Sequence, residues 1–319
     1  KRTLKGVFDT LTKPADILVT GSARLNVYKK GGDSLTGRYF HFRLHPFSIR
    51  EMETPDAADP DDVIDSIFSA SRSVRKNNVR LFDAMMRFGP FPEPLLAQDE
   101  KEARIWRRNR LETVIREDLR DLTRIPELSK IEMLASLLPD RVASPLSVAS
   151  LREDLEVSFD TVKRWLTCLK ELYYAFEIKP WRKSIARAIR KEGKLYLWDF
   201  GEVASNAPAR FENLVACHLL KACHYWTDTG EGNFDLWYLR NKEKQEIDFL
   251  ITRNAIPWLP VETKWGDTEP SPNWRRFLPA LPVSGAVQLV PKPGVWNIHS
   301  IEGRRLLVAT AADVLPYFV

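Results

Sequence analysis

Two carboxylates and a lysine in the last third of the chain have the spacing of a hydrolytic metal site. Asp248 interrupts the apolar run 246–250, and Glu262 and Lys264 lie two residues apart in the run 261–265. Because side chains alternate along a strand, Glu262 and Lys264 share a face, where Asp248 can join them if the two runs pair. Two carboxylates suit Mg²⁺, and a nearby ammonium can orient a water nucleophile or stabilise the transition state. This set predicts metal-assisted phosphodiester hydrolysis at Asp248, Glu262 and Lys264, with the two carboxylates as Mg²⁺ ligands.

The elements expected to position these residues follow one another in the order helix, three strands, helix, strand. Glu212 lies on the first helix, where we expect it to supply a further oxygen ligand or a proton acceptor. The alternative is that Asp248 sits at a strand end and that Glu262 and Lys264 form an ordinary ion pair. The expected elements are helix Ala209–Tyr225, strands Phe234–Leu239, Ile247–Ile251 and Trp258–Lys264, helix Pro272–Leu281 and strand Ala286–Val290.

The middle of the chain has the pattern of a helix-turn-helix followed by a hairpin. Helices are expected over 147–155 and 159–174, and strands over 176–178 and 195–197, which together predict a winged helix. The stretch 179–194 between the two strands is strongly basic. Cations there and on the second helix would contact the phosphates of DNA without reading its sequence. An adaptor between domains is the alternative. The residues expected to face phosphates are Lys163, Arg164, Arg182, Lys183, Arg187 and Arg190.

Composition excludes several classes of protein. With 44% hydrophobic and 29% charged residues, the chain is neither disordered nor collagen-like. A net charge of +5 permits an anionic partner without demanding one. No apolar stretch reaches the ~20 residues of a membrane span, so no membrane partner is expected. Three cysteines are too few for a disulfide scaffold, which favours the cytoplasm. Cys217 and Cys223 fall on different sides of one predicted helix, so ordinary buried positions are expected rather than a zinc site.

The acidic and lysine positions resemble the PD-(D/E)XK nuclease fold. Asp248, then Glu262-Thr263-Lys264 on the next strand, match its pattern, and Glu212 holds the helical acidic position. The αβββαβ element order strengthens the likeness. One departure is that Ile247, and not a proline, precedes Asp248. Fold and activity are separate inferences, so cleavage does not follow from the likeness alone.

Read as a whole, the chain resembles a prokaryotic family of AAA-type ATPases that continue into a C-terminal domain of unknown function. The resemblance implies that Thr20 or Ser22 is a sensor of bound ATP and that Arg38 lies near the γ-phosphate. No phosphate-binding Gly-x-x-x-x-Gly-Lys-Ser/Thr motif occurs in the sequence. We therefore expect a C-terminal piece of a longer protein, with ATP binding and oligomers only in the full-length form. The segments that carry the resemblance are 17–22, 35–38, 44–48, 88–93, 117–119, 195–201 and 211–215.

These inferences predict an α/β chain with four parts. They are a partial AAA-type α/β module (1–55), a helical linker region (56–143), a winged-helix-like region (144–201) and a PD-(D/E)XK nuclease-like domain (202–319). Two functions remain open. One is an ATPase fragment that binds nucleic acid and hydrolyses it with Mg²⁺. The other is a non-catalytic adaptor that binds DNA or a protein partner, in which the nuclease-like fold is only a scaffold.

Overall fold

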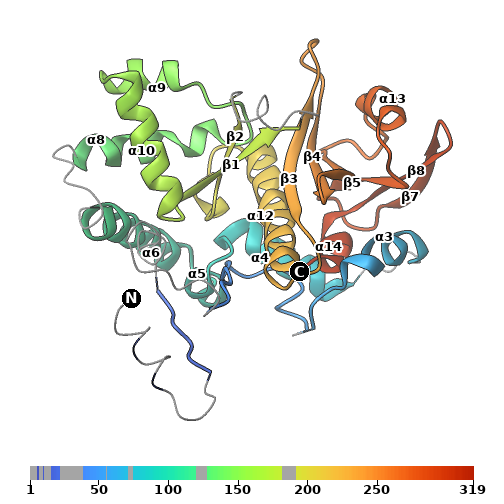
Figure 1. Ribbon diagram of the computed structural model, residues 1–319, viewed down its shortest axis with the longest axis horizontal. Coiled ribbons are helices and arrows are strands. Elements are labelled where there is room, and N and C mark those ends of the chain that lie inside the picture. The colour runs from blue at the N-terminus through green and yellow to red at the C-terminus, as the bar shows by residue number, and fades with distance from the viewer. Residues whose placement is uncertain are drawn as a thin grey trace.

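A computed structural model shows an eight-stranded mixed sheet flanked by helices on both faces, with a helical region to one side (Figure 1). None of the helices described is both long enough and apolar enough to cross a membrane. The structure describes residues 6, 10, 16–21, 39–54, 56–70, 75–119, 128–181 and 192–319.

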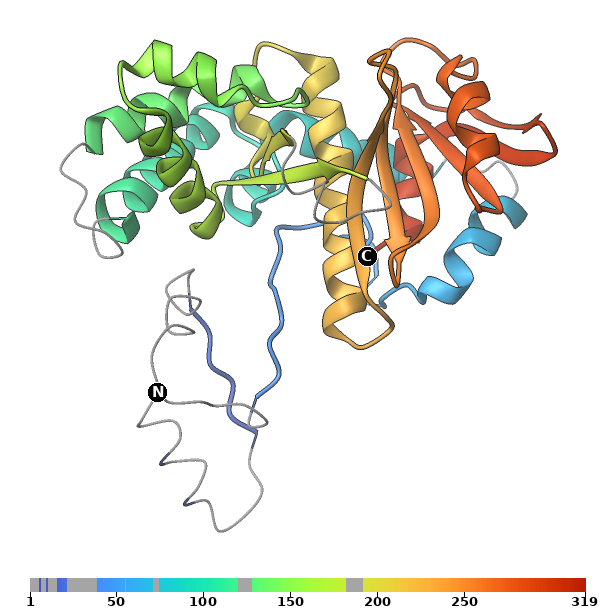
Figure 2. The same cartoon turned by 45° about the horizontal axis from the view of Figure 1, so that its top comes forward.

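The N-terminal run Ile17–Thr20 is not the buried strand that its apolar residues predict. It is irregular, and its side chains face solvent, with Leu18 89% exposed. The run 39–44, whose residues alternate imperfectly in the manner of a strand, is also irregular and leads away from the body of the molecule (Figure 2), with Leu44 fully exposed. A strand buried on both faces needs neighbouring strands, and no described strand pairs with either run. None of the described residues from 16 to 48 therefore forms part of a sheet.

Helices dominate from residue 60 to 171, as the sequence predicts. The second half of this region is a helix pair whose N-caps are Ser147 and Ser158, each accepting a backbone hydrogen bond three residues ahead. Leu151, Trp165 and Leu169 are buried between the two helices and their neighbours. The helices are α3 (Pro60–Ser69), α4 (Lys76–Phe88), α5 (Pro92–Ala97), α6 (Glu100–Glu112), the π-helix η2 (Thr113–Leu119), α8 (Leu128–Leu137), the 3₁₀ turn η3 (Pro139–Arg141), α9 (Val148–Leu155) and α10 (Phe159–Glu171).

The sheet has the strand order β2-β1-β3-β4-β5-β6-β8-β7. The predicted hairpin is present as the antiparallel pair β1–β2, and β1 also pairs in parallel with β3. One sheet therefore runs across the predicted boundary at residue 201. The strands are β1 (Ala175–Pro180), β2 (Lys194–Leu197), β3 (Phe234–Arg240), β4 (Glu246–Arg253), β5 (Ile256–Thr263), β6 (Gly285–Val290), β7 (Trp296–Ile301) and β8 (Arg304–Thr310).

Both faces of the sheet are covered, which explains why its central strands are apolar on both sides. Phe249 and Ile251 of β4 join the main core with α12 (Ala207–Asp228), whereas Leu250 packs into a second core around Trp274 of α13 (Asn273–Phe277). The remaining short elements are η4 (Phe200–Glu202), η5 (Leu278–Ala280), α14 (Ala311–Val314) and η6 (Leu315–Tyr317).

Candidate functional site

The two predicted catalytic carboxylates meet where β4 and β5 lie side by side. The strands are antiparallel, with Phe249 opposite Val261, which brings Asp248 next to Glu262. The backbone N–H of Asp248 donates to Glu262 Oε2 at 3.1 Å. Both side chains are buried. Antiparallel pairing of two runs that were recognisable in the sequence thus places the two acids together.

Lys264 and Thr263 occupy oxygens of these two carboxylates. Lys264 Nζ lies 2.6 Å from Glu262 Oε1. Thr263 donates to Asp248 Oδ2 twice, from its backbone N–H at 2.9 Å and from its hydroxyl at 2.7 Å. Each carboxylate therefore has a hydrogen-bond donor fixed against it by strand β5 and the residue that follows the strand.

A second lysine, Lys194, stands at the centre of the acidic cluster. It opens strand β2 and is 1% exposed. Its Nζ lies 3.1 Å from Glu212 Oε1, 3.2 Å from Glu246 Oε1 and 3.2 Å from Asp248 Oδ1. Three carboxylates from α12 and β4 thus share one ammonium group. We call Lys194, Glu212, Glu246 and Asp248 the ammonium cluster.

Glu212 reaches the ammonium cluster from the beginning of α12. The helix is capped by Asn206, whose side chain accepts from the backbone N–H of Ala209 at 3.0 Å. One turn later, Glu212 Oε1 accepts a hydrogen bond from the Tyr196 hydroxyl at 2.7 Å. Strand alternation places Lys194 and Tyr196 of β2 on the same side, so both reach Glu212.

The electrostatics of the site follow from burial and from these partners. Burial, with Asp248 adding to it, raises the pKa of Glu262 to about 8 and that of Glu212 to about 7. Burial alone would raise the pKa of Asp248, but Lys194 and Thr263 outweigh it and hold that pKa below its usual value. Burial also opposes the charge on Lys194, yet Tyr196 and the three carboxylates raise the Lys194 pKa well above normal. The ammonium group is therefore charged at neutral pH.

The carboxylates do not fit the Mg²⁺ ion that their pattern predicts. Glu212 Oε1 and Asp248 Oδ1 both already accept a hydrogen bond from Lys194 Nζ. The other Asp248 oxygen accepts from Thr263, and Glu262 pairs with Lys264. Within the described residues, no three His, Cys, Asp or Glu side chains are arranged to hold a metal ion. The Lys194 ammonium lies between Glu212 and Asp248 and engages one oxygen of each.

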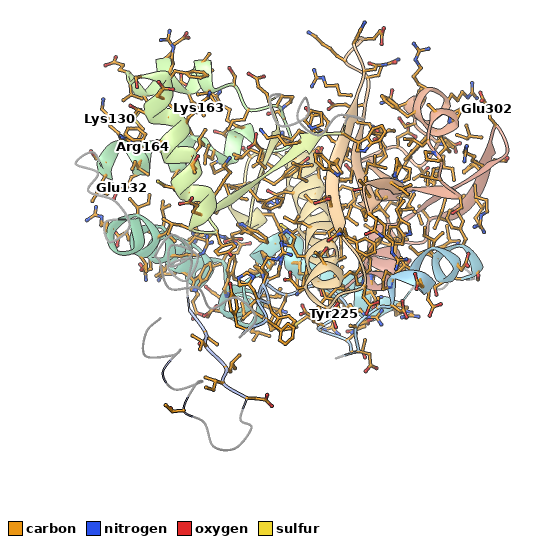
Figure 3. The ribbon with its side chains drawn as sticks, in the orientation of Figure 1. Lys130, Glu132, Lys163, Arg164, Tyr225 and Glu302 are labelled. Atoms are coloured by element: carbon orange, nitrogen blue, oxygen red, sulfur yellow. The ribbon has the colours of Figure 1, made fainter. Side chains whose placement is uncertain are left out.

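The predicted nucleic-acid residues that the structure describes lie on α10, which contributes no residue to this cluster. Lys163 and Arg164 are exposed on α10, at the opposite end of the molecule from Glu302 (Figure 3). Lys163 Nζ lies 4.4 Å from the centre of the Phe159 ring, and neither basic residue is ion-paired with a carboxylate of the described chain. Arg182, Lys183, Arg187 and Arg190 lie outside the described residues.

The predicted ATP sensor positions are placed only in part. Thr20 is exposed in an irregular segment and does not follow a buried strand. Ser22 and Arg38 lie outside the described residues. The expected grouping of these residues around a nucleotide remains a prediction from resemblance.

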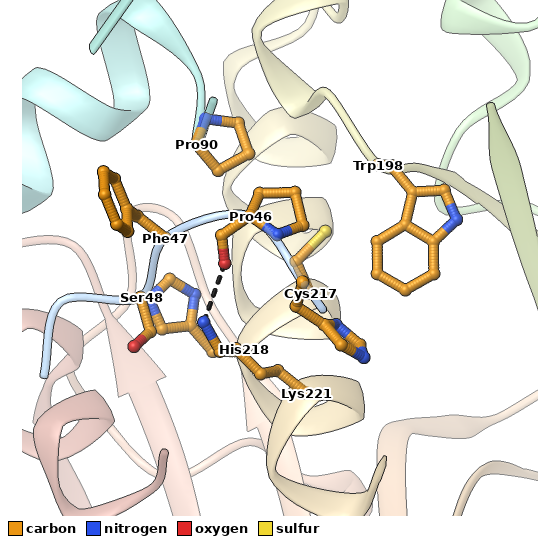
Figure 4. A pocket seen from close by; sticks show the side chains of 9 residues that line it. Pro46, Phe47, Ser48, Pro90, Trp198, Cys217, His218 and Lys221 are labelled. Carbon is orange, nitrogen blue, oxygen red and sulfur yellow. Dashed lines mark hydrogen bonds between the residues drawn. The ribbon is translucent and has the colours of Figure 1, made fainter. Parts of the chain in front are cut away.

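Sequence reasoning missed a polar contact between the segment Arg43–Glu51, which we call the strap, and one side of α12. Arg43 binds Asp228 with a shortest contact of 2.6 Å, and the His45 and His224 rings meet at 2.9 Å. Lys221 donates to the Pro46 carbonyl at 2.8 Å (dashed in Figure 4) and pairs with Glu51. The α12 partners recur every three or four residues, which is the spacing of one helix face.

His218 completes the contact between the strap and α12. Its Nε2 accepts from the backbone N–H of Ile49 at 3.2 Å, and its Nδ1 lies 2.9 Å from the Leu214 carbonyl. A carbonyl can only accept, so Nδ1 carries the proton and His218 is neutral. The adjacent Cys217 and the more distant Cys223 are buried free thiols of the same helix. The only sequence signal for this contact was the helical spacing of the polar residues from 218 to 228.

Comparisons with known proteins find sequence similarity to an AAA domain and to domains of unknown function. The profile of an AAA domain matches residues 1–53, and two domains of unknown function, DUF8612 and DUF4143, match residues 79–210 and 209–298. The chain is thus similar to AAA-type ATPases over its first 53 residues and to domains of unknown function over residues 79–298. No solved structure matches the chain.

The curated relatives are longer proteins. The chain is 23% identical over 274 residues to the uncharacterized protein Rv2008c of Mycobacterium tuberculosis, covering 80% of the chain and 56% of the relative. Over 250 residues it is 22% identical to an uncharacterized protein of Haemophilus influenzae (75% and 56%). Over 246 residues it is 23% identical to uncharacterized protein MJ1544 of Methanocaldococcus jannaschii (74% and 52%). The chain thus spans about half the length of the curated relatives it matches.

Proposed function

We propose that this chain is a non-hydrolytic binding region of an AAA-type ATPase-like protein, and that its nuclease-like sheet serves as a scaffold. The observation that carries the proposal is the pairing of all three predicted acidic catalytic residues with internal donors. Glu212 and Asp248 bind Lys194, and Glu262 binds Lys264. A hydrolytic Mg²⁺ site needs carboxylates that are free to coordinate the ion and water.

The binding partner that the surface favours is the backbone of a nucleic acid. Lys163 and Arg164 are adjacent and exposed on the second helix of a pair that is followed by a hairpin, which is the winged-helix order. Because no described carboxylate is ion-paired with them, both charges are available to phosphates. Contacts of this kind supply affinity without sequence preference.

A salt titration of binding to duplex DNA tests this proposal. We expect the Lys163→Gln/Arg164→Gln variant to bind more weakly than the parent. Its binding should also depend less on salt, with the negative slope of log K against log[salt] shallower by about 2. Arg275→Gln/Arg276→Gln is the matched control, because it removes two adjacent exposed cations from α13. If both variants lose the same amount of DNA affinity, the loss comes from the lower net charge and not from these two positions on α10. A parent chain without DNA affinity at low salt would point to a protein partner.

Mg²⁺-dependent hydrolysis is the second candidate, favoured by the contact between Glu262 and Lys264 beside Asp248. Its test is the nicking of supercoiled plasmid in Mg²⁺ by the parent chain and by Glu262→Gln. The scaffold proposal expects no nicking from either protein. Nicking by the parent that disappears in Glu262→Gln would establish hydrolysis and refute the scaffold proposal. ATP binding by a longer form of the protein is a separate question, which this assay leaves unchanged.

A further inference from the structure

We infer that the Lys194 ammonium permanently replaces the divalent cation that the acidic pattern would otherwise bind. The inference deepens the proposed scaffold function and rests on it. Lys194 touches Glu212 and Asp248, the helix and strand acids of the pattern, and recruits Glu246 as well. The positive charge that holds these acids together therefore comes from the chain.

Lys194 donates hydrogen bonds to Glu212 and Asp248 and forms an ion pair with Glu246. A lysine ammonium has three N–H donors and no acceptor. Nζ of Lys194 has three carboxylate oxygens at 3.1–3.2 Å, one from each acid of the ammonium cluster. Mg²⁺ would require oxygens at about 2.0–2.1 Å, so each oxygen lies about 1 Å too far out for that ion. The spacing of the cluster is that of an ammonium group.

The ammonium is also held in place by the backbone. Lys194 pairs with Ile178 across the β1–β2 hairpin. Its Nζ lies 5.7 Å from the centre of the Tyr238 ring, and its side chain is 1% exposed. A surface lysine can swing its flexible stem into water, but withdrawal of this buried one would take the cation they share from three acids. Glu212 would keep its bond from Tyr196, Asp248 its bonds from Thr263, and Glu246 its ion pair with Arg240. Lys194 is therefore a fixed part of the site, and no exchange with dissolved Mg²⁺ is expected.

The test compares Lys194→Met, which keeps a long unbranched side chain without its charge, with the parent and with Lys264→Met. The control removes the other ammonium of the same site, the one that pairs with Glu262. Thermal unfolding is followed with and without millimolar Mn²⁺, and Mn²⁺ bound per chain is measured by equilibrium dialysis. We expect the parent to bind no Mn²⁺ and to keep its Tm. We expect Lys194→Met to lose about 5–10 °C, to bind one Mn²⁺ and to regain much of that Tm, whereas Lys264→Met gains nothing from Mn²⁺.

Three results would overturn the inference. In the first, the parent binds one Mn²⁺ and Asp248→Asn does not. In the second, Lys194→Met has the same Tm as the parent. In the third, Lys194→Met has a lower Tm, and Mn²⁺ does not raise it. If Lys194→Met does not fold, Lys194→Met/Asp248→Asn should fold, because one unpaired charge has been removed. Failure of that double variant would also count against the inference. Plasmid nicking and DNA binding are not used in this test, so its failure is distinguishable from that of the proposed function.

Discussion

Acid should weaken the contact between the strap and α12, and His218 is the residue through which this can be measured. The buried ring is neutral, with its two nitrogens committed to the Leu214 carbonyl and to the N–H of Ile49. Protonation would place a second N–H against the Ile49 N–H and a charge in the core. His218→Gln keeps an amide donor and a carbonyl acceptor but cannot take up the proton. The perturbation is therefore a lowering of pH in the parent and in this variant.

The size of the effect follows from the pKa. Burial lowers the pKa of His218 from 6.5 to about 4. The unfolded chain takes up the proton near pH 6.5 and the folded chain only near pH 4, so stability is full above pH 6.5 and falls as the pH drops between these values. The shift corresponds to about 3 kcal/mol in the free energy of unfolding. His224 and His45, whose pKa values burial lowers to about 4 and about 2, act in the same direction.

The assay is urea unfolding followed by tryptophan fluorescence at pH 7, 6, 5 and 4. The parent should lose about 3 kcal/mol more than His218→Gln between pH 7 and pH 4. His299→Gln is the matched control, because it makes the same substitution on β7, away from the strap. If the parent and His218→Gln lose stability in parallel over this range, the reasoning from burial is refuted.

Three further predictions concern the packing of the helical region against the sheet. Asp199→Asn leaves Arg107 without its buried partner at 2.9 Å and should lower the free energy of unfolding by about 3–5 kcal/mol in urea titrations. This prediction would be wrong if Asp199→Asn lowered the free energy of unfolding by less than Glu132→Gln, which breaks the exposed Arg116–Glu132 pair. Burial, with Asp199 adding to it, raises the pKa of Glu202 from 4.5 to about 7, so the stability that its proton gives is full below pH 4.5 and is lost as the pH rises through 7. Glu202→Gln should be more stable than the parent at pH 8 by about 1–3 kcal/mol and equal to it near pH 4. Leu169→Ala should cost about 2–5 kcal/mol because Leu169 is fully buried in α10, and a loss below 1 kcal/mol in thermal or urea unfolding would refute it.

The elements of the C-terminal region could be predicted because they alternate or repeat clearly in the sequence. The predicted strand Ile247–Ile251 is the centre of β4, and the predicted helix Ala209–Tyr225 is α12 to within three residues at each end. The same patterns placed Asp248 beside Glu262. Strands β7 and β8 were missed. Trp296–Ile301 is an edge strand whose residues are mostly exposed or half-buried, so it gives no apolar run.

The role of Lys194 could not be read from the sequence. It ends a basic stretch, which predicts a solvated position facing phosphates, yet it is buried. Lys179, at the other end of that stretch, pairs with Glu177. Charge composition reports how many cations a segment holds, but not which carboxylates the fold will bring to them. Those of the ammonium cluster lie at least 18 residues further along the chain.

The N-terminal runs illustrate the opposite error. The apolar residues from Ile17 to Val19 indicate a preference for burial, and the sequence pattern predicted a strand from that preference alone. Whether such a run is buried depends on its neighbours, which a pattern within the run does not reveal. In the described structure no strand lies beside it, and the side chains are exposed.

Strand β1 belongs both to the hairpin after α10 and to the large sheet. Its residues Lys179 and Pro180 pair with β3, and the N–H of Trp181 donates to the Tyr238 carbonyl at 2.7 Å. Moving the hairpin away from the sheet would break these backbone bonds. Leu169 of α10, Phe176 of β1 and Phe249 of β4 belong to one core. A partner bound to α10 would therefore move together with the sheet, and the orientation of the sheet would set the orientation of that partner.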